Sequence, residues 1–168
     1  GPNSPDHRCI FLACSDHGAF DIRIVEVFLI AALEWMGGEG VQLVNISLGY
    51  TKGYTDPKEN YQPKDMNGQS MVAKAVNYAY SHENMLVIVA AGNDGLDPSW
   101  RVVSTPGDAI GALTVGATKL QTWDRMDYSS IGPDSLGFLK PNVSTYSTSG
   151  TSFSTPIITG LAAAIMQK

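Results

Sequence analysis

Hydrophobic runs along the chain alternate with polar, turn-forming segments in a regular order. Apolar residues dominate segments 8–14, 41–48, 85–91 and 112–118, and polar or glycine-containing sequence bounds each of them. Short apolar runs with such boundaries are typical of strands that are buried on both faces of a parallel sheet. The sequence therefore predicts four buried strands.

Between and after these strands, apolar positions recur with the period of a helix. Segment 24–36 is apolar nearly all round, and Gly37-Gly38 favours a stop directly after it. A second helix is predicted to follow Ser70, a residue type that caps helices, because the apolar positions beyond it fall on one face. A third helix is predicted after Gly150 and includes the apolar run 157–166.

Strand, helix, strand, helix, strand is the order of α/β proteins with a doubly wound parallel sheet. The 168 residues, of which 43% are hydrophobic and 16% charged, are enough for one domain with a substantial core and too few for two comfortable ones. We therefore expect a single domain over residues 1–168. In such sheets the functional residues gather at the carboxyl ends of the strands.

Charge and cysteine content narrow the classes of partner. With a net charge of −5, the chain has no Lys/Arg cluster that could bind nucleic-acid phosphates. No apolar run reaches the roughly 18 residues that cross a membrane, because Glu26 and Glu34 interrupt the longest one. Cys9 and Cys14 lie in one predicted strand and point to opposite faces, so we expect no disulfide between them. Neither nucleic acid nor a membrane is expected as a partner.

Local sequence patterns give little support for a nucleotide-binding site, a metal site or a glycosylation site. Segment Gly92–Gly95 lacks the glycine spacing of a dinucleotide-binding fingerprint and the Lys-Ser/Thr pair of a P-loop. A nucleotide-binding domain is therefore the least favoured interpretation of this chain. The three histidines have no metal-ligand spacing with one another or with the cysteines. Glycosylation sequons occur at Asn45 and Asn142, but the first lies in a predicted buried strand.

The segment from Gly150 to Pro156, GTSFSTP, places serines where a Ser/Thr-rich loop turns into the last predicted helix. The first turn of a helix has unpaired N–H groups and a partial positive charge. An oxyanion formed beside Ser152 would be stabilised there. By itself, however, the segment favours the interpretation that Ser152 and Ser154 act only as helix caps, a role that serine has in many helices.

Six segments, in this order, resemble the subtilisin family of serine proteases: VNISLG (44–49), VIVAAGNDG (87–95), LTVGAT (113–118), YSSIGP (128–133), KPN (140–142) and GTSFSTP (150–156). The resemblance implies a subtilisin-like three-layer α/β sandwich, a serine endopeptidase activity and secretion from the cell. Each segment alone is short, and the specificity lies in their combination and order.

The resemblance also implies a role for each matching position. Ser152 corresponds to the nucleophile, Asn93 to the side-chain amide of the oxyanion hole, and Thr151 lies beside the nucleophile. The positions that resemble a substrate-binding strand and a pocket wall are Ser47, Leu48, Gly49, Ala90, Ala91 and Gly92. An extended peptide would pair with the Ser47 segment and place its scissile carbonyl between Ser152 and Asn93. Thr105-Pro106 falls near a position where the family often has a cis proline.

The chain departs from the family's pattern in several places. Neither the aspartate motif nor the His-Gly-Thr motif that normally precede the serine is present, so the domain is interpreted as N-terminally truncated. Asp16-His17-Gly18 follows the wrong strand and is read as an exposed turn, and His82 as a surface residue at a helix end. Segment 143–149 is shorter than usual, and Ile157 stands where the family has a histidine.

We therefore expect the partial core of a subtilisin-like endopeptidase that forms an acyl-enzyme at Ser152 on polypeptide substrates. A serine hydroxyl needs a base, so we expect negligible hydrolysis by these 168 residues alone. The missing N-terminal portion of the domain is a further candidate partner. The alternative is a non-catalytic homologue that binds extended peptides or acts as a scaffold. No cofactor and no metal ligands are expected; calcium is common in the family, but no cage of oxygen ligands is identifiable.

Overall fold

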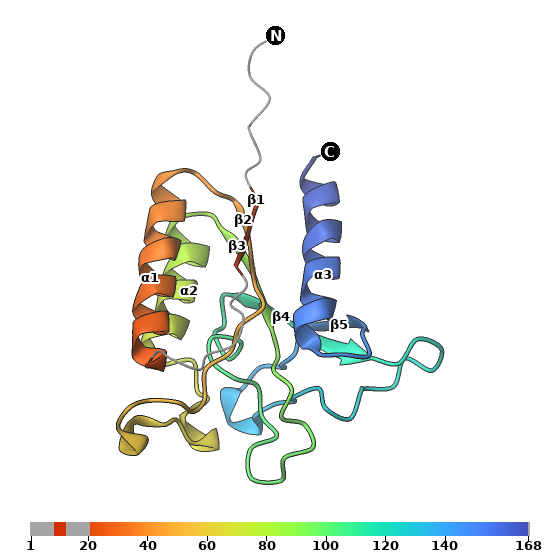
Figure 1. Cartoon of the computed structure of the whole chain (residues 1–168). Helices are drawn as coiled ribbons and strands as arrows, with labels where there is room; N and C mark the ends of the chain where they lie inside the picture. Colours follow the sequence, from red (N-terminus) through yellow and green to blue (C-terminus); the bar gives the residue numbers. More distant parts are fainter. Residues whose placement is uncertain (1–8, 13–20, 168) are drawn as a thin grey trace.

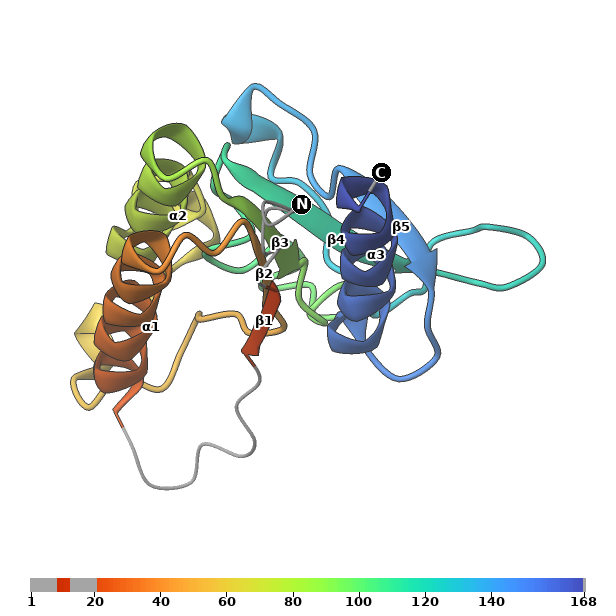
Figure 2. The same ribbon diagram turned by 90° about the horizontal axis from the view of Figure 1, so that it is seen from above.

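The computed structural model describes residues 21–167 and the backbone of residues 9–12. Five parallel strands form one sheet in the order β1-β2-β3-β4-β5: Cys9–Leu12, Leu43–Ile46, Leu86–Ala90, Ala112–Thr118 and Val143–Tyr146. Helices α1 (Ile22–Gly38) and α2 (Met71–His82) cover one face of the sheet, and α3 (Thr151–Met166) covers the other (Figures 1 and 2). The predicted three-layer α/β sandwich is confirmed. The predictions for Cys14 and Asp16-His17-Gly18 lie outside the described residues.

The core is divided between the two faces of the sheet because successive side chains of a strand point in opposite directions. On the side of α1 and α2, Val44 and Ile46 of β2 pack with Val87 and Val89 of β3. On the side of α3, Leu43, Ile88 and Val115 form a smaller cluster with apolar residues of that helix. Burial on both faces explains why β3 appears in the sequence as a continuous apolar run and why β2 is apolar except at Asn45.

Side-chain caps determine where the first two helices begin. Helix α1 starts two residues before the predicted segment, because Asp21 Oδ1 accepts a hydrogen bond from Arg23 N at 2.8 Å. Helix α2 starts as predicted, with Ser70 Oγ accepting from Ala73 N at 3.0 Å. His82 ends α2 in an exposed position, as predicted, and its ring stacks on Tyr78 with centroids 4.4 Å apart.

Strand β5 is the element that the hydrophobic pattern did not predict. It pairs with β4 from Val115↔Val143 to Thr118↔Tyr146 and forms an edge of the sheet. Three of its four residues are exposed, so no apolar run marks the strand in the sequence. The short segment 143–149 therefore contains an edge strand and the turn that leads to α3.

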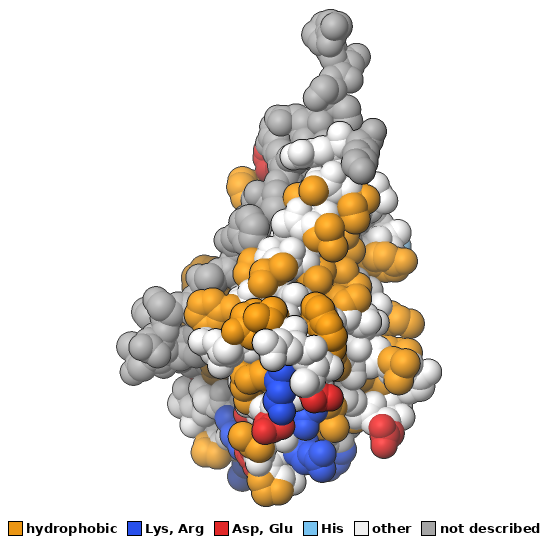
Figure 3. All heavy atoms as spheres, turned by 90° about the vertical axis from the view of Figure 1, so that its right-hand side faces the viewer, with side chains coloured by type: hydrophobic (Ala, Val, Ile, Leu, Met, Phe, Trp, Pro, Cys, Tyr) orange, Lys and Arg blue, Asp and Glu red, His pale blue; other side chains and the backbone are white. Residues whose placement is uncertain are grey.

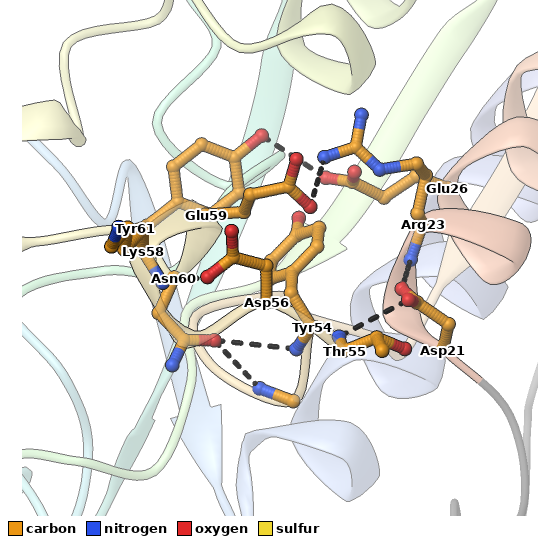
Figure 4. Close-up of polar contacts among 11 residues, drawn as sticks. Asp21, Arg23, Glu26, Tyr54, Thr55, Asp56, Lys58, Glu59, Asn60 and Tyr61 are labelled. Atoms are coloured by element: carbon orange, nitrogen blue, oxygen red, sulfur yellow. Dashed lines mark hydrogen bonds and ion pairs between the residues drawn. The ribbon is translucent and has the colours of Figure 1, made fainter.

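The long segment between β2 and α2 is held against the first turns of α1 (Figure 4). Asp21 Oδ2 accepts from Thr55 N at 3.1 Å, and Tyr61 donates its hydroxyl to Glu26 Oε1 at 3.1 Å. Arg23 and Glu59 form an ion pair at 2.6 Å, with both side chains about half exposed. These contacts hold the segment against the start of α1.

Lys140 of the KPN segment is buried, although lysine is rarely buried without partners. Its ammonium group donates to Ala112 O at 2.6 Å, to Thr114 Oγ1 at 2.9 Å and to Asn142 Oδ1 at 3.1 Å. These bonds join the long β4–β5 connection to the start of β4. Burial lowers the pKa of Lys140 to about 8, and the buried carboxylate of Asp108 opposes this effect.

Because the folded-state pKa of Lys140 lies below that of an unfolded lysine, the unfolded chain binds more protons between about pH 8 and 10.5. The free energy of unfolding is therefore expected to gain about 1–3 kcal/mol from this group as the pH rises through that window. Urea unfolding at pH 7.5, 9 and 10.5 measures the effect, with Lys140→Met as the reference that lacks it. Identical pH profiles for the two proteins would contradict the assignment.

Candidate active site

The turn into α3 sets the position of Ser152, the second residue of this helix. Gly150 precedes the helix with φ of +140°, a conformation that favours glycine, and a Cβ there would lie 3.4 Å from Asn93 Nδ2. Gly150 provides no side-chain cap, and Ser154 Oγ donates to Thr151 O at 2.9 Å. The two serines therefore do not act as caps, which leaves the hydroxyl of half-buried Ser152 at the helix N-terminus.

Asn93 follows the carboxyl end of β3, and Thr151 fixes the orientation of its side-chain amide. Its Oδ1 accepts from Thr151 N at 2.8 Å and from Thr151 Oγ1 at 3.1 Å. The same threonine hydroxyl accepts from Gly92 N at 3.1 Å. Asn93 is an exposed residue, and with Oδ1 occupied by two donors, Nδ2 is the part of the amide that can donate to a ligand.

Ser47, just beyond β2, makes two reciprocal hydrogen bonds with Ser152. Ser152 Oγ donates to Ser47 O at 3.2 Å, and Ser47 Oγ donates to Ser152 O at 3.1 Å. The second bond replaces a missing helical one, because Pro156, four residues after Ser152, has no N–H to donate to that carbonyl. The start of α3 is thus held against the end of β2.

Eight of the nine predicted site residues line one pocket of about 220 Å³; they are Ser47, Leu48, Gly49, Ala90, Gly92, Asn93, Thr151 and Ser152. Ala91 does not line it: the residue is buried, and its N–H donates to Val115 O at 3.0 Å. The structure thus brings together the segments at the ends of β2 and β3 and the start of α3. The assigned roles of these residues remain predictions.

Three further residues line this pocket, and the sequence did not point to them: Thr51, Asp94 and Ser104. The Ser104 hydroxyl lies 2.6 Å from where a Cβ on Gly92 would be, so glycine is required there. Burial raises the pKa of Asp94, Asp97 adds to this effect, and Lys52 opposes it. Asp94 directly follows Asn93, and that adjacency was the only available signal in the sequence.

The family model of the subtilases matches residues 25–168. This chain belongs to the subtilase family. It is 30% identical to subtilisin DY of Bacillus licheniformis over 149 residues, which are 83% of this chain and 48% of that protein. It is 32% identical to the M-protease of Shouchella clausii over 145 residues, which are 81% of this chain and 32% of that protein. The predicted family is confirmed, and the chain spans about half or less of the length of these relatives.

Solved structures agree with this assignment. The prenylagaramide maturation protease PagA is 30% identical with a TM-score of 0.56, and the match covers 82% of this chain and 48% of that one. The CspB protease of Clostridium perfringens gives a TM-score of 0.66 over 84% of this chain and 60% of that one. Its identity is 12%, so this second likeness concerns the fold alone.

In the described part of this subtilase, no imidazole group lies at Ser152. The one described histidine, His82, lies at the end of α2, just before the amino end of β3, and its Nδ1 is hydrogen-bonded to Ser81 Oγ at 2.7 Å. Ser47 and Asn93 lie instead beyond the carboxyl ends of β2 and β3. His82 is therefore at the wrong edge of the sheet to act as the base.

A larger hollow of about 800 Å³ lies between segments 100–102 and 131–140 of the subtilase, and none of the predicted site residues lines it. Among the described residues, no three His, Cys, Asp or Glu side chains gather as metal ligands would. No helix in the described ranges is both long enough and apolar enough to cross a membrane. The pocket around Ser152 therefore remains the candidate active site.

Proposed function

We propose that this subtilase is the nucleophile-bearing part of a serine endopeptidase that cleaves polypeptides through an acyl-enzyme at Ser152. One observation carries the proposal: the Ser152 hydroxyl and the Asn93 amide share a pocket at the N-terminus of α3. Secreted subtilisins of this family support the further proposal that the protein acts outside the cytoplasm.

In the proposed reaction, a base takes the proton of Ser152 while Oγ bonds to the carbonyl carbon of the substrate. Negative charge then moves to the carbonyl oxygen, where Asn93 Nδ2 and the N-terminus of α3 stabilise it. The C–N bond breaks, the base returns the proton to the leaving amine, and water later hydrolyses the ester by the reverse sequence. The extended substrate would pair with the backbone of Ser47–Gly49.

We further propose that additional polypeptide of the same protease domain supplies the base and covers α3. The exposed face of this helix carries large apolar side chains one turn apart, beginning beside Ser152: Phe153, Ile157, Leu161 and Ile165, which are 52–63% exposed. Figure 3 shows hydrophobic side chains over much of this face, with charged groups gathered at its lower end. Helix α3 contains no charged residue, which is typical of a helix that is buried on several sides.

If additional polypeptide covers α3, a substitution on its exposed face has different effects on the stability of this chain and of the complete protease domain. Leu161 and Leu120 are equally exposed here, at 58% and 57%. Leu161→Glu is expected to change the free energy of unfolding of this chain by less than about 0.5 kcal/mol, and to destabilise the complete domain by about 2 kcal/mol or more because the position becomes buried.

Urea unfolding of both proteins measures these effects, with Leu120→Glu as the matched control that is harmless in each. An equally small effect of Leu161→Glu in the complete domain would contradict the proposed cover. A second copy of this chain could cover the α3 face instead. Sedimentation tests this: if the 168-residue chain self-associates and Leu161→Glu abolishes the association, the face is an interface between two copies.

The proposed activity is tested by measuring the hydrolysis of a quenched fluorescent peptide. The longest product of the gene and this 168-residue chain are assayed in parallel. Hydrolysis by the long product that Ser152→Ala abolishes, together with none by the 168-residue chain, supports the proposal. Peptide binding by the long product without hydrolysis would favour the alternative, a non-catalytic homologue that binds extended peptides or serves as a scaffold.

A further inference from the structure

A buried hydrogen-bonded chain connects the middle of α3 to the backbone of Ser152. Thr159 Oγ1 donates to Asn45 Oδ1 at 2.9 Å, and Asn45 Nδ2 donates to Ser47 Oγ at 3.0 Å. Ser47 Oγ then donates to Ser152 O at 3.1 Å. Thr159 is fully buried and Asn45 is 2% exposed, and neither lines the pocket of the candidate active site.

Asn45 is an unexpected residue type at its position. The other residues of β2 are aliphatic and buried, and an unpaired amide there would cost about 1–3 kcal/mol. Its burial also rules out the sequon at Asn45 as a glycosylation acceptor in the folded chain. The amide is tolerated in the core because Thr159 and Ser47 satisfy its oxygen and its nitrogen.

The direction of the chain of donors follows from the requirements of Ser152. Its carbonyl lacks a helical donor because of Pro156, so it needs the proton of the Ser47 hydroxyl. The Ser47 oxygen can then only accept from Asn45, which requires Nδ2 to face Ser47 and Oδ1 to face Thr159. The Thr159 hydroxyl has one proton and lies 2.9 Å from that oxygen and 3.0 Å from Thr155 O. With Oδ1 facing it, the hydroxyl donates to Asn45, because donation to Thr155 O would leave two oxygen acceptors in contact without a proton.

We infer that Asn45 and Thr159 are positioning residues for the nucleophile, which act through Ser47 on the carbonyl of Ser152. The inference rests on the proposed function, since it assigns the network to the reaction at Ser152. Loss of the Thr159 hydroxyl leaves Asn45 Oδ1 without its donor, so the amide is held less firmly against Ser47. The bond from Ser47 to Ser152 O weakens in turn, and the backbone that carries Oγ loosens. A displacement of the nucleophile by a fraction of an ångström lowers the rate of attack without changing the pocket.

In the longest active product of the gene, Thr159→Val is expected to lower kcat about tenfold and to leave KM within twofold. The labelling rate of Ser152 by a fluorophosphonate is expected to fall by the same factor. Thr159→Ser, which restores the hydroxyl, is expected to recover both rates to within about twofold. Thr155→Val is the matched control, because Thr155 is also fully buried in α3 and its hydroxyl donates to Thr151 O at 2.6 Å, outside the network of Asn45. The backbone carbonyl of Thr155, which lies 3.0 Å from Thr159 Oγ1, is unchanged in this variant.

A second measurement, on the 168-residue chain, does not need activity. Ser47 and Thr159 are connected in the network through Asn45, so Ser47→Ala and Thr159→Val are expected to be non-additive. The unfolding constant of the double variant, from urea titrations, is expected to be about fivefold below the value that the two single effects predict. Ser47→Ala with Thr155→Val is the control pair and is expected to be additive.

The outcomes separate the inference from the proposed function. One outcome is that Ser47→Ala and Thr159→Val are non-additive, but the long product neither hydrolyses peptide nor reacts with the fluorophosphonate. The network would then be structural only, and both the positioning role and the protease function would be overturned. Hydrolysis that depends on Ser152, with Thr159→Val at the unsubstituted rate, would overturn the inference alone. Additivity of Ser47→Ala and Thr159→Val would overturn the network itself.

Discussion

Ser152→Ala is expected to lower kcat of the complete protease about 10⁶-fold and to leave KM within a few-fold, a magnitude established for nucleophile removal in a subtilisin. The physical reason is that acyl transfer requires an oxygen nucleophile at this position, whereas the peptide is bound by other groups of the pocket. The measurement is the rate of hydrolysis of a chromogenic peptide over a range of concentrations.

Ser154→Ala is the matched control for this substitution. Both serines belong to the first turn of α3, but Ser154 is fully buried and its Oγ donates to Thr151 O. Its replacement is expected to lower stability by about 1 kcal/mol and to change kcat less than about threefold. Hydrolysis by Ser152→Ala at more than a hundredth of the unsubstituted rate would show that Ser152 is not the nucleophile.

Substitution of Asn93 has the second-largest expected effect. Removing a single oxyanion donor lowers kcat about 10²–10³-fold, again a value established on a subtilisin. Asn93→Ala removes the Nδ2 donor to the oxyanion and also the Oδ1 acceptor that Thr151 binds. It is therefore expected to lower both kcat and the free energy of unfolding. Asn93→Asp keeps an oxygen for Thr151 N and Oγ1, so it is expected to lower kcat at least as much with a smaller loss of stability.

The pair of variants separates two roles of the same side chain. Peptide kinetics report the donor at Nδ2, and urea unfolding reports the bonds to Thr151. If Asn93→Asp retained the unsubstituted kcat, donation from Nδ2 to the oxyanion would be disproved. If it lost as much stability as Asn93→Ala, the acceptor role of Oδ1 would be unnecessary for the fold.

Much of the fold was predictable because burial imposes a pattern on the sequence. The strands β2, β3 and β4 are buried on both faces, so apolar residues dominate each of them. Helix α2 begins at a serine whose capping role depends on nearby backbone only. Strand β5 was not predictable, since an exposed edge strand has neither an apolar run nor an alternation of buried side chains.

By itself the sequence determined the family, the sheet with helices on both faces, and the residue types of the candidate site, because these depend on local pattern and on the order of motifs. Only the tertiary structure decided how Ser152 is held. The contacts of Ser152 with Ser47 and of Asn45 with Thr159 join residues 105 and 114 positions apart. Such contacts leave no local pattern, because each residue satisfies a polar group that only folding brings beside it.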